Sequence, residues 1–355
     1  MEQKYIKISS IGEFGLIDNI RKIVDIRVED TALHDNLLIG IADDAAVFRT
    51  TVGKVQLFTT DAFVEGIHFD LTFTSFKHLG WKVITANISD IAAMGGVPRY
   101  VTIALSLPQK ITVEMVEEFY EGAALACKKY SCLIVGGDTT ASLTNMVISV
   151  ALTGEASEQC VRYRKDAKPG EYICVTGHLG ASFAGLKILK REKDRYTQST
   201  IRNKFKPNLE PYIEAVERHL MPRPRLDLSK ILSEQVKIGA MIDISDGLAS
   251  EVHHICKESN VGALVYEHNI PLQNITQRIA AEFSEPPTDY ALYGGEEYEL
   301  LFTIGAEEFK KLEMLSSDIT IIGRITEKEK GIELVHENGE QEALRFGGWD
   351  HFSAS

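Results

Sequence analysis

VQLFTTDAFVEGIHF, residues 55–69, begins as an apolar strand pattern and continues into two threonines, an aspartate, a glutamate, a glycine and a histidine. Burying a polar or charged side chain is costly unless it has a partner. The second part of this stretch therefore either lies in a solvated loop or faces a positively charged group. Composition, charge and the motifs in the rest of the chain discriminate between these two interpretations.

The composition is that of a large globular protein. With 355 residues, 44% of them hydrophobic, the chain can bury substantial cores, and its length favours about two domains. Its apolar runs are shorter than the roughly 18 residues that span a bilayer, and the start, MEQKYIKISS, lacks the apolar core of a signal peptide. We therefore expect a cytoplasmic protein that has no membrane partner.

Charge and cysteine content exclude further classes. A net charge of −13 argues against a nucleic-acid partner, because binding the phosphate backbone requires clustered Lys and Arg. It is compatible with a phosphate ligand that arrives with metal ions. The five cysteines include no C-x-x-C pair, so neither a disulfide framework nor a zinc site is expected.

Strand and helix patterns alternate along the whole chain, which predicts an α/β fold. The first half has strands near 55–60, 100–107, 132–137 and 146–154, with helices near 75–93 and 112–130. The second half has strands near 172–177, 240–245, 262–267, 298–304 and 320–325, with helices near 180–190, 246–258 and 306–315. The charged tract at 190–207 is expected to be an exposed excursion. A turn at KDAKPGEY, 165–172, separates the two series, and we expect domains at 1–155 and 156–355.

Aspartates recur where the predicted strands end. Asp61 and Asp138 each follow a strand, and Asp43 and Asp44 are adjacent in ADDAAV. Asp90 shares a helix face with apolar residues, at four-three-four spacing from Leu79. An isolated charge there would cost several kcal/mol, so Asp90 needs a partner or a metal ion.

Ordinary structural roles compete with this interpretation. Ser245 and Asp246 in IDISDGL are good N-cap residues for the helix predicted from 246, and GGDTT at 136–140 could be a plain turn. Repetition favours a metal site, because at least six aspartates at strand ends have few basic residues beside them. Oxygen clusters of this kind suit Mg²⁺ with a bound nucleotide. The usual phosphate-binding motifs are missing: GASFAGLK, 180–187, lacks the G-K-[ST] ending of a P-loop.

Seven motifs, in order, carry a resemblance over nearly the whole chain: IADDAAV, TTDAFVEGIHF, ANISDIAAMGGVP, IVGGDTT, RKDAKPGEYICVTG, IDISDGL and GGEEYELLF. Together they resemble the thiamine-monophosphate kinases, of the superfamily that includes aminoimidazole ribonucleotide synthetase. Two positions depart from that family's pattern. Ala42 replaces a glycine and Glu297 replaces an aspartate, and neither change removes a position expected to bind metal.

The resemblance implies that thiamine monophosphate is phosphorylated to thiamine diphosphate by direct transfer of the ATP γ-phosphate, assisted by several Mg²⁺ ions. It implies an α/β (α+β) fold of two domains, in which an N-terminal domain binds ATP and Mg²⁺ and pairs in a homodimer, and a C-terminal domain completes the site. No covalent nucleophile is implied. The implied Mg²⁺ ligands are Asp44, Thr59, Thr60, Asp61, Asp90, Asp138, Asp243 and Asp246; the ATP contacts are Gly137, Asp138, Arg164 and Ser245; the thiamine monophosphate contacts are His68, Glu296 and Trp349.

Alternatives remain for several of these residues and for the function. Arg164 could be a solvated loop charge, His68 a satisfied polar residue and Trp349 an apolar plug that anchors the tail. Another ATP-using enzyme of the superfamily, or a non-catalytic sensor of nucleotide or Mg²⁺, could carry the same aspartates. A selenide-activating enzyme would need a cysteine near the N-terminus, whereas the first is Cys127, and the related hydrogenase maturation factor would need one at the C-terminus, where the chain ends HFSAS.

Overall fold

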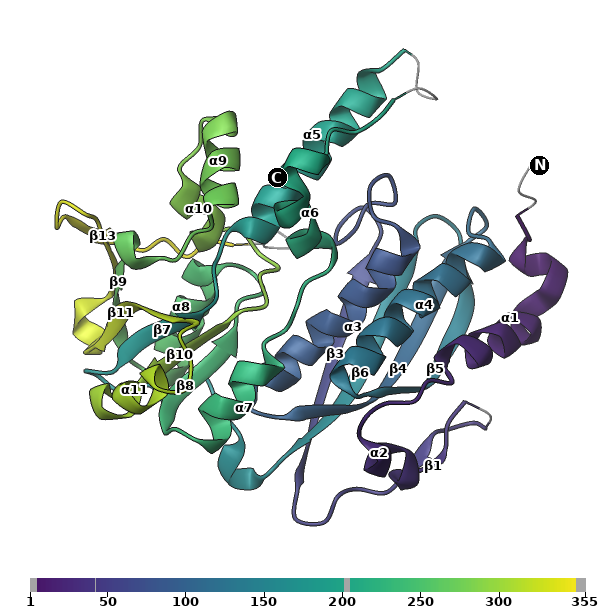
Figure 1. Ribbon diagram of the computed structural model, residues 1–355, viewed down its shortest axis with the longest axis horizontal. Coiled ribbons are helices and arrows are strands. Elements are labelled where there is room, and N and C mark those ends of the chain that lie inside the picture. The colour runs from purple at the N-terminus through teal and green to yellow at the C-terminus, as the bar shows by residue number, and fades with distance from the viewer. Residues whose placement is uncertain (1–4, 42, 201–204, 349–355) are drawn as a thin grey trace. The chain divides into compact units, whose positions relative to one another are not determined.

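The computed structural model describes residues 5–41, 43–200 and 205–348, and the chain divides into two compact units. The first unit holds Met1–Ile91 and Gly96–Glu158. The second holds Gln159–Ser355 together with the short segment Ala92–Gly95. The α/β (α+β) fold class is confirmed, because each unit combines a sheet with covering helices (Figure 1).

In the described part of the first unit, four strands form a sheet in the order β3-β6-β4-β5. Only β4 and β5 are parallel. Helices α3 and α4 lie side by side over one face of the sheet (Figure 1). The strands are β3 Val55–Val64, β4 Val97–Pro108, β5 Leu133–Ser142 and β6 Val147–Ala156; the helices are α1 Ile8–Val24, α2 Thr31–Asn36, α3 Phe76–Ala93 and α4 Val113–Tyr130; a small ribbon pairs β1 Leu37–Ile39 with β2 Val47–Phe48.

Helices α3 and α4 meet through two glycines. A Cβ atom on Gly80 of α3 would lie 1.9 Å from the carbonyl oxygen of Phe119, and one on Gly122 of α4 would lie 1.9 Å from the carbonyl oxygen of Lys77. No side chain can occupy either position without moving a backbone. The helix that carries Asp90 is therefore held at a fixed distance from its neighbour.

The sheet face opposite these helices carries small side chains. Ala62, Ser149, Ala104 and Asp138 lie in one row across the four strands, because these residues are paired in register. The neighbouring row is Thr60, Ala151, Thr102 and Gly136. Phe58, on the same face of the edge strand, is 70% exposed. Farther along this face, at Tyr100 and Leu133, Leu33 of α2 and Phe48 of β2 cover it.

The described part of the second unit contains a sheet in the order β13-β12-β9-β11-β7-β10-β8, in which only β12 and β9 are parallel. Its strands are β7 Tyr172–Thr176, β8 Ile238–Asp243, β9 Gly262–Tyr266, β10 Leu300–Ile304, β11 Ile319–Thr326, β12 Ile332–Val335 and β13 Gln341–Ala343; its helices are α5 Ala181–Gln198, α6 Ile213–Leu220, α7 Leu226–Glu234, α8 Leu248–Ser259, α9 Asn274–Phe283, α10 Pro287–Leu292 and α11 Ala306–Glu313.

This sheet is buried on both faces. One core joins Ile242 and Leu301 of the sheet to Val252 and Ile255 of α8. The other joins Met241 and Phe302 to residues of α7 and α11. Strands that are buried on both faces have nearly continuous apolar sequences. AMID in β8 and ELLFTI in β10 have this pattern, which is why both strands were predicted from the sequence.

The strands and helices predicted from the sequence are all present, but three of their ends were wrong. Strand β3 continues past Asp61 to Val64, and β5 continues past Asp138 to Ser142, so both aspartates lie inside strands. Helix α5 extends to Gln198 through a tract that was expected to be an exposed excursion. In that tract Glu192 is buried and paired with Arg191 and Arg195. None of the helices in the described part of the chain has the length and apolarity needed to cross a bilayer.

Candidate functional site

In the first unit, three oxygen-bearing side chains gather where β3 faces α3. The Thr59 hydroxyl donates a hydrogen bond of 2.5 Å to Oδ2 of Asp90. Asp61 lies two residues along β3, so strand alternation directs it to the same face as Thr59. Asp90 is half-buried, one helical turn beyond the buried Ala86. Asp90 was expected to need a partner, and Thr59, the first residue of the TTDAF motif, is one.

Asp138 and Thr60 lie on the opposite face of the sheet. Asp138 is exposed and paired in register with Ala104, in the row of small residues described above. Thr60 donates its hydroxyl hydrogen to the carbonyl oxygen of Val150 at 2.9 Å. Gly137 is exposed beside Ile103 of β4. The strand register therefore separates Asp138 from Asp61 instead of bringing them together.

Asp44 lies on the surface, in the turn before β2, where its N–H donates to Oδ1 of Asp43 at 2.9 Å. Ala42, the first departure from the family pattern, lies outside the described residues. Over residues 5–41, 43–200 and 205–348, no three His, Cys, Asp or Glu side chains are close enough to hold a metal ion. Of the ligands expected in the first unit, Thr59 and Asp90 are hydrogen-bonded, and Asp61 lies on the same face of β3 as Thr59. The remaining expected ligands lie on the opposite face of the sheet or in the surface turn before β2.

His68 ends the TTDAFVEGIHF motif in a defined tautomer. Its Nδ1 accepts the N–H of Val64 at 3.0 Å, and its ring packs edge-on against Phe63. In the neutral ring the proton must then be on Nε2, which becomes the hydrogen-bond donor. The geometry prepares His68 to donate to an anionic or carbonyl oxygen.

In the second unit, IDISDGL forms a tight turn at the end of β8. Asp243 is the last residue of the strand and is buried. The expectation that Ser245 or Asp246 caps the next helix was wrong: α8 starts at Leu248, and Gly247 occupies the N-cap position with φ of 126°. The Glu251 side chain reaches back instead and accepts the N–H of Asp246 at 3.1 Å. Burial raises the pKa of Glu251 to about 7.

The backbone of Arg164 lies beside the opposite end of α8 from this turn. Its carbonyl oxygen accepts a hydrogen bond of 2.8 Å from the hydroxyl of Ser259 at the end of α8. Burial, followed by the positive charge of Arg164, lowers the pKa of His254. Arg164 is exposed in a turn, and the hydrogen bond with Ser259 is made by its backbone, so both interpretations of its guanidinium group stay open.

The GGEEYEL segment before β10 is bound to the same turn. The N–H of Glu296 donates to the carbonyl oxygen of Ser245 at 2.7 Å, and the N–H of Tyr298 donates to that of Ile244 at 2.9 Å. Glu296 and Tyr298 both have positive φ, 64° and 54°. Such a backbone costs about 1–3 kcal/mol in a residue with a side chain, and it often marks a functional site.

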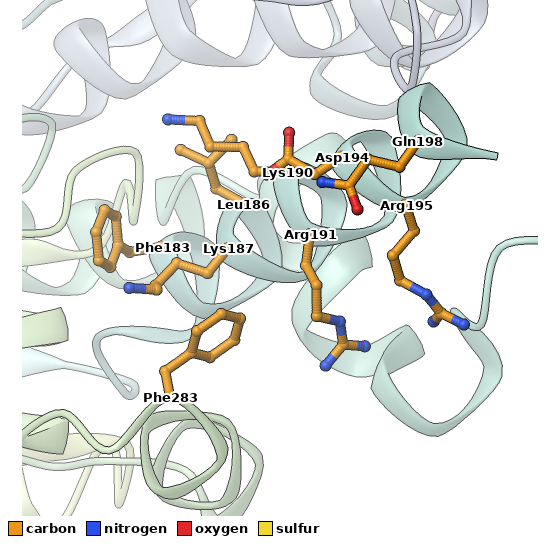
Figure 2. A pocket seen from close by; sticks show the side chains of 9 residues that line it. All are labelled: Phe183, Leu186, Lys187, Lys190, Arg191, Asp194, Arg195, Gln198 and Phe283. Carbon is orange, nitrogen blue, oxygen red and sulfur yellow. The ribbon is translucent and has the colours of Figure 1, made fainter.

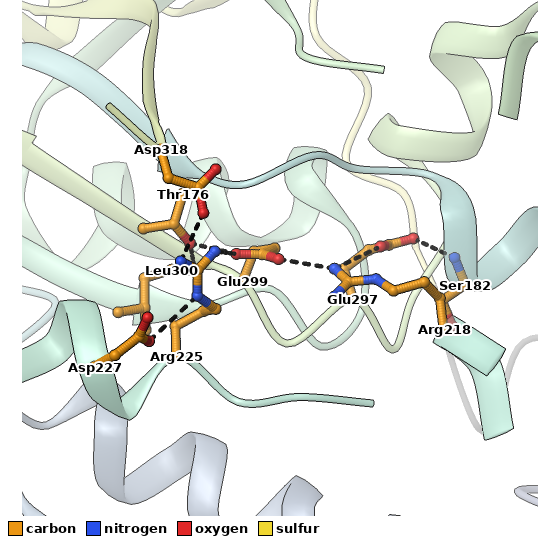
Figure 3. A network of polar contacts seen from close by, with 9 residues as sticks. All are labelled: Thr176, Ser182, Arg218, Arg225, Asp227, Glu297, Glu299, Leu300 and Asp318. Carbon is orange, nitrogen blue, oxygen red and sulfur yellow. Dashed lines mark hydrogen bonds and ion pairs between the residues drawn. The ribbon is translucent and has the colours of Figure 1, made fainter. Parts of the chain in front are cut away.

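Two acidic side chains of this segment, Glu297 and Glu299, enter a buried polar network (Figure 3). Glu299 is 2.7 Å from Arg218 and 2.8 Å from Arg225. Glu297, the second departure from the family pattern, accepts the N–H of Ser182 in the first turn of α5 at 2.9 Å. Arg218 is 3.9 Å from the other oxygen of Glu297. Burial raises the pKa of Glu297 to about 7.

The side chain of Glu296 contacts a different residue of α6. Its Oε2 is 3.3 Å from Nδ1 of His219, a buried residue on α6 next to Arg218. The same Nδ1 is 3.3 Å from the hydroxyl of Ser182. The segment is therefore fixed by two consecutive residues of α6.

Close to the C-terminus, two glycines let the chain approach the turn after β8 and Tyr293, the residue before GGEEYEL. A Cβ atom on Gly348 would lie 2.6 Å from the carbonyl oxygen of Asp246, and one on Gly347 would lie 2.9 Å from the ring of Tyr293. Only glycine fits this double contact. Trp349 itself lies outside the described residues, so its two interpretations stay open.

A cavity of about 390 Å³ opens elsewhere in this unit, along α5 (Figure 2). Three of its four basic residues are in ion pairs: Lys187 with Glu285, Arg191 with Glu282 and Arg195 with Glu192. None of the expected site residues lines it. We therefore do not assign the reaction to this cavity.

The sequence analysis missed five residues that shape the site in the second unit. Except for Glu251, whose partner Asp246 is five residues away, their partners are distant along the chain, so no spacing reveals them. The only signal is RHLMPRPRL, 218–226, which contains three arginines and two prolines. The missed residues are Arg218, His219, Arg225, Glu251 and Glu299.

Known proteins are similar to this chain over nearly its full length. The family model of the AIR synthase related protein N-terminal domain matches residues 42–156, and that of the C-terminal domain matches residues 168–336. Thiamine-monophosphate kinase of Aquifex aeolicus is 35% identical over 348 residues, 98% of this chain and 100% of that protein. The enzyme of Bacillus subtilis is 33% identical over 96% of this chain and 100% of its own length.

A solved structure of AaThiL complexed with AMPPCP and TMP has a TM-score of 0.73 to this chain at 34% sequence identity, and the match covers 98% of this chain and 99% of that one. Sequence and structure agree over nearly the full length of both proteins. The resemblance found in the seven motifs is thereby confirmed, and the chain belongs to the thiamine-monophosphate kinase family.

Proposed function

We propose that this protein phosphorylates thiamine monophosphate to thiamine diphosphate by direct in-line transfer of the γ-phosphate of ATP. One observation carries the proposal in the structure: the N–H of Glu296 is bonded to the carbonyl oxygen of Ser245. A residue expected to contact the substrate is thus joined to one expected to contact ATP. The relatives named thiamine-monophosphate kinase, one of them solved with AMPPCP and TMP, support the same reaction.

The donor atoms present fit Mg²⁺. Thr59, Asp61 and Asp90 supply only hydroxyl and carboxylate oxygens on one side of β3, and Asp243 and Asp246 supply carboxylates beside Ser245. Hard oxygen ligands without sulfur or imidazole are the set that Mg²⁺ prefers. When bound, the ions would neutralise the charge that builds up between two phosphate groups. We propose as ligands Asp44, Thr59, Thr60, Asp61, Asp90, Asp138, Asp243 and Asp246.

The protein's own groups bind and orient the reactants. Arg164 can donate to phosphate oxygens in a fork, and Ser245, Gly137 and Asp138 would hold the nucleotide. Nε2 of His68 would donate to the substrate, which Glu296 and Trp349 would also contact. The chemistry needs no protein nucleophile, because the attacking phosphate oxygen is already ionised near pH 7. Positioning and electrostatic stabilisation would supply most of the rate.

We also propose a division of labour between domains and a homodimer. The N-terminal domain, 1–155, would bind ATP and Mg²⁺ and form the dimer, and the C-terminal domain, 156–355, would complete the site. Two features of the first sheet support pairing with a second copy. Its open face carries small residues and the exposed Phe58, and its edge strands present unpaired backbone groups.

Steady-state ADP release, measured with and without thiamine monophosphate, tests the proposal. The expected result is ADP release that depends on thiamine monophosphate and equals the thiamine diphosphate formed, as quantified by chromatography. Asp90→Asn should abolish it, whereas Asp194→Asn, which changes an exposed aspartate on α5, should not. ATP binding without turnover would indicate a sensor. ATP hydrolysis that ignores thiamine monophosphate would indicate a different substrate.

A further inference from the structure

His219 lies outside every motif that connects this chain to its family, yet it contacts a residue expected to bind the substrate. Its side chain is on α6, is 4% exposed, and places Nδ1 3.3 Å from Oε2 of Glu296. Glu296 is half-buried and has a left-handed backbone. We propose that His219 is a positioning residue, which holds the carboxylate of Glu296 in the orientation that binds thiamine monophosphate. This inference rests on the proposed function.

The hydrogen-bond chemistry fixes the direction of this contact. A hydrogen bond across this 3.3 Å contact has Nδ1 of His219 as its donor, because an ionised carboxylate can only accept. The Ser182 hydroxyl, also 3.3 Å from Nδ1, can then accept a hydrogen bond from the same N–H. Ser182 is fully buried in the first turn of α5. Its own N–H is bonded to Glu297, so the rotation of the imidazole is restricted from two sides.

The backbone explains why Glu296 needs such a partner. Its N–H is fixed to Ser245, and its φ of 64° turns the side chain out of the direction that an extended strand would give. A glutamate side chain has three rotatable bonds, and each rotamer-rich side chain that a ligand must immobilise weakens binding. A carboxylate already held by His219 meets the substrate without that loss.

The neighbouring residues show that α6 as a whole anchors this segment. Arg218, the residue before His219, pairs with Glu299 and lies near Glu297 (Figure 3). Arg218 therefore holds the segment in place, whereas His219 contacts the acidic side chain that is expected to reach the substrate. Replacing a histidine that has only a structural role would change the stability of the protein, but it would not raise KM for one substrate and leave KM for the other unchanged.

Steady-state kinetics of a matched pair of variants test the role. Asparagine places its amide nitrogen near the position of Nδ1, whereas glutamine places it near Nε2. We expect His219→Gln to raise KM for thiamine monophosphate about tenfold and to leave KM for ATP within about twofold. His219→Asn should stay within about threefold of the wild type for both substrates. Because both variants keep a buried polar side chain of similar size, the comparison remains valid even if His219→Ala does not fold.

His336→Ala is the control, since it removes another His–Glu pair of this unit, 2.6 Å from Glu267. It should leave both KM values unchanged. In a Glu296→Ala background, His219→Gln should add less than twofold to KM for thiamine monophosphate, because its effect acts through Glu296. Calorimetric binding of thiamine monophosphate should show the same order of affinities.

The outcomes separate this inference from the proposed function. A wild-type protein without activity toward thiamine monophosphate would refute the function itself. With an active wild type, equal kinetics for His219→Gln and the wild type would overturn the positioning role. So would a full additional effect of His219→Gln in the Glu296→Ala background, or a rise in both KM values together.

Discussion

Glu297 makes the stability of the second unit depend on pH in an unusual direction. Its carboxyl is 1% exposed, and burial raises its pKa from the ordinary value of 4.5 to about 7, against the opposing effect of Arg218. The folded state thus holds this proton more tightly than the unfolded state does. The contribution to stability is fully present below pH 4.5 and is lost as the pH rises through about 7.

The size of the effect follows from the two pKa values. One pKa unit corresponds to about 1.4 kcal/mol, so the difference between 4.5 and about 7 corresponds to about 3 kcal/mol. For a unit of about 200 residues, this changes Tm by roughly 6–12 °C. Glu297→Gln removes the titration and keeps an oxygen that can accept the N–H of Ser182.

Thermal unfolding followed by far-UV circular dichroism between pH 5 and 8 measures this contribution. Relative to the wild type, Glu297→Gln should gain stability as the pH rises, because only the wild type must bury a charge at pH 8. Glu313→Gln, at the exposed end of α11, is the control and should follow the wild-type curve. Parallel curves for the wild type and Glu297→Gln would refute the reasoning.

Three further predictions concern metal, substrate and assembly. Asp90→Ala should abolish turnover and leave the protein folded, with Tm in the absence of Mg²⁺ unchanged or higher, because a half-buried negative charge is removed; activity close to wild type would exclude its metal role. The rate at fixed MgATP should rise with free Mg²⁺ if protein carboxylates recruit further ions, whereas a flat response would contradict this. Light scattering should give a dimer of the 39.5 kDa chain, and a monomer at micromolar concentration would rule out the pairing proposed for the first sheet.

The sequence predicted the elements well, because apolar periodicity decides which segments pack into a sheet or onto it. It failed where pairing between strands overrides local chemistry. A charged residue such as Asp61 is expected to end a strand, but β3 continues past it because β6 pairs with β3 along its whole length.

For the site, motifs identified residues on the two segments after β8 and before β10, since their composition is unusual. They did not reveal what holds those segments. His219 and Arg218 look like ordinary helix residues until the fold brings α6 against Glu296 and Glu299. The opposite-face positions of Asp61 and Asp138 were also hidden, because they depend on strand register.

The glycine contact between α3 and α4 restricts how this protein can change over evolution. An ordinary core tolerates a larger residue at one position when a neighbour becomes smaller, but Gly80 and Gly122 each face a backbone carbonyl oxygen, which has no smaller replacement. No compensating substitution is therefore available at this crossing. The distance between α4 and α3, the helix that carries Asp90, is set by main-chain contact, and it can persist while the surrounding side chains change.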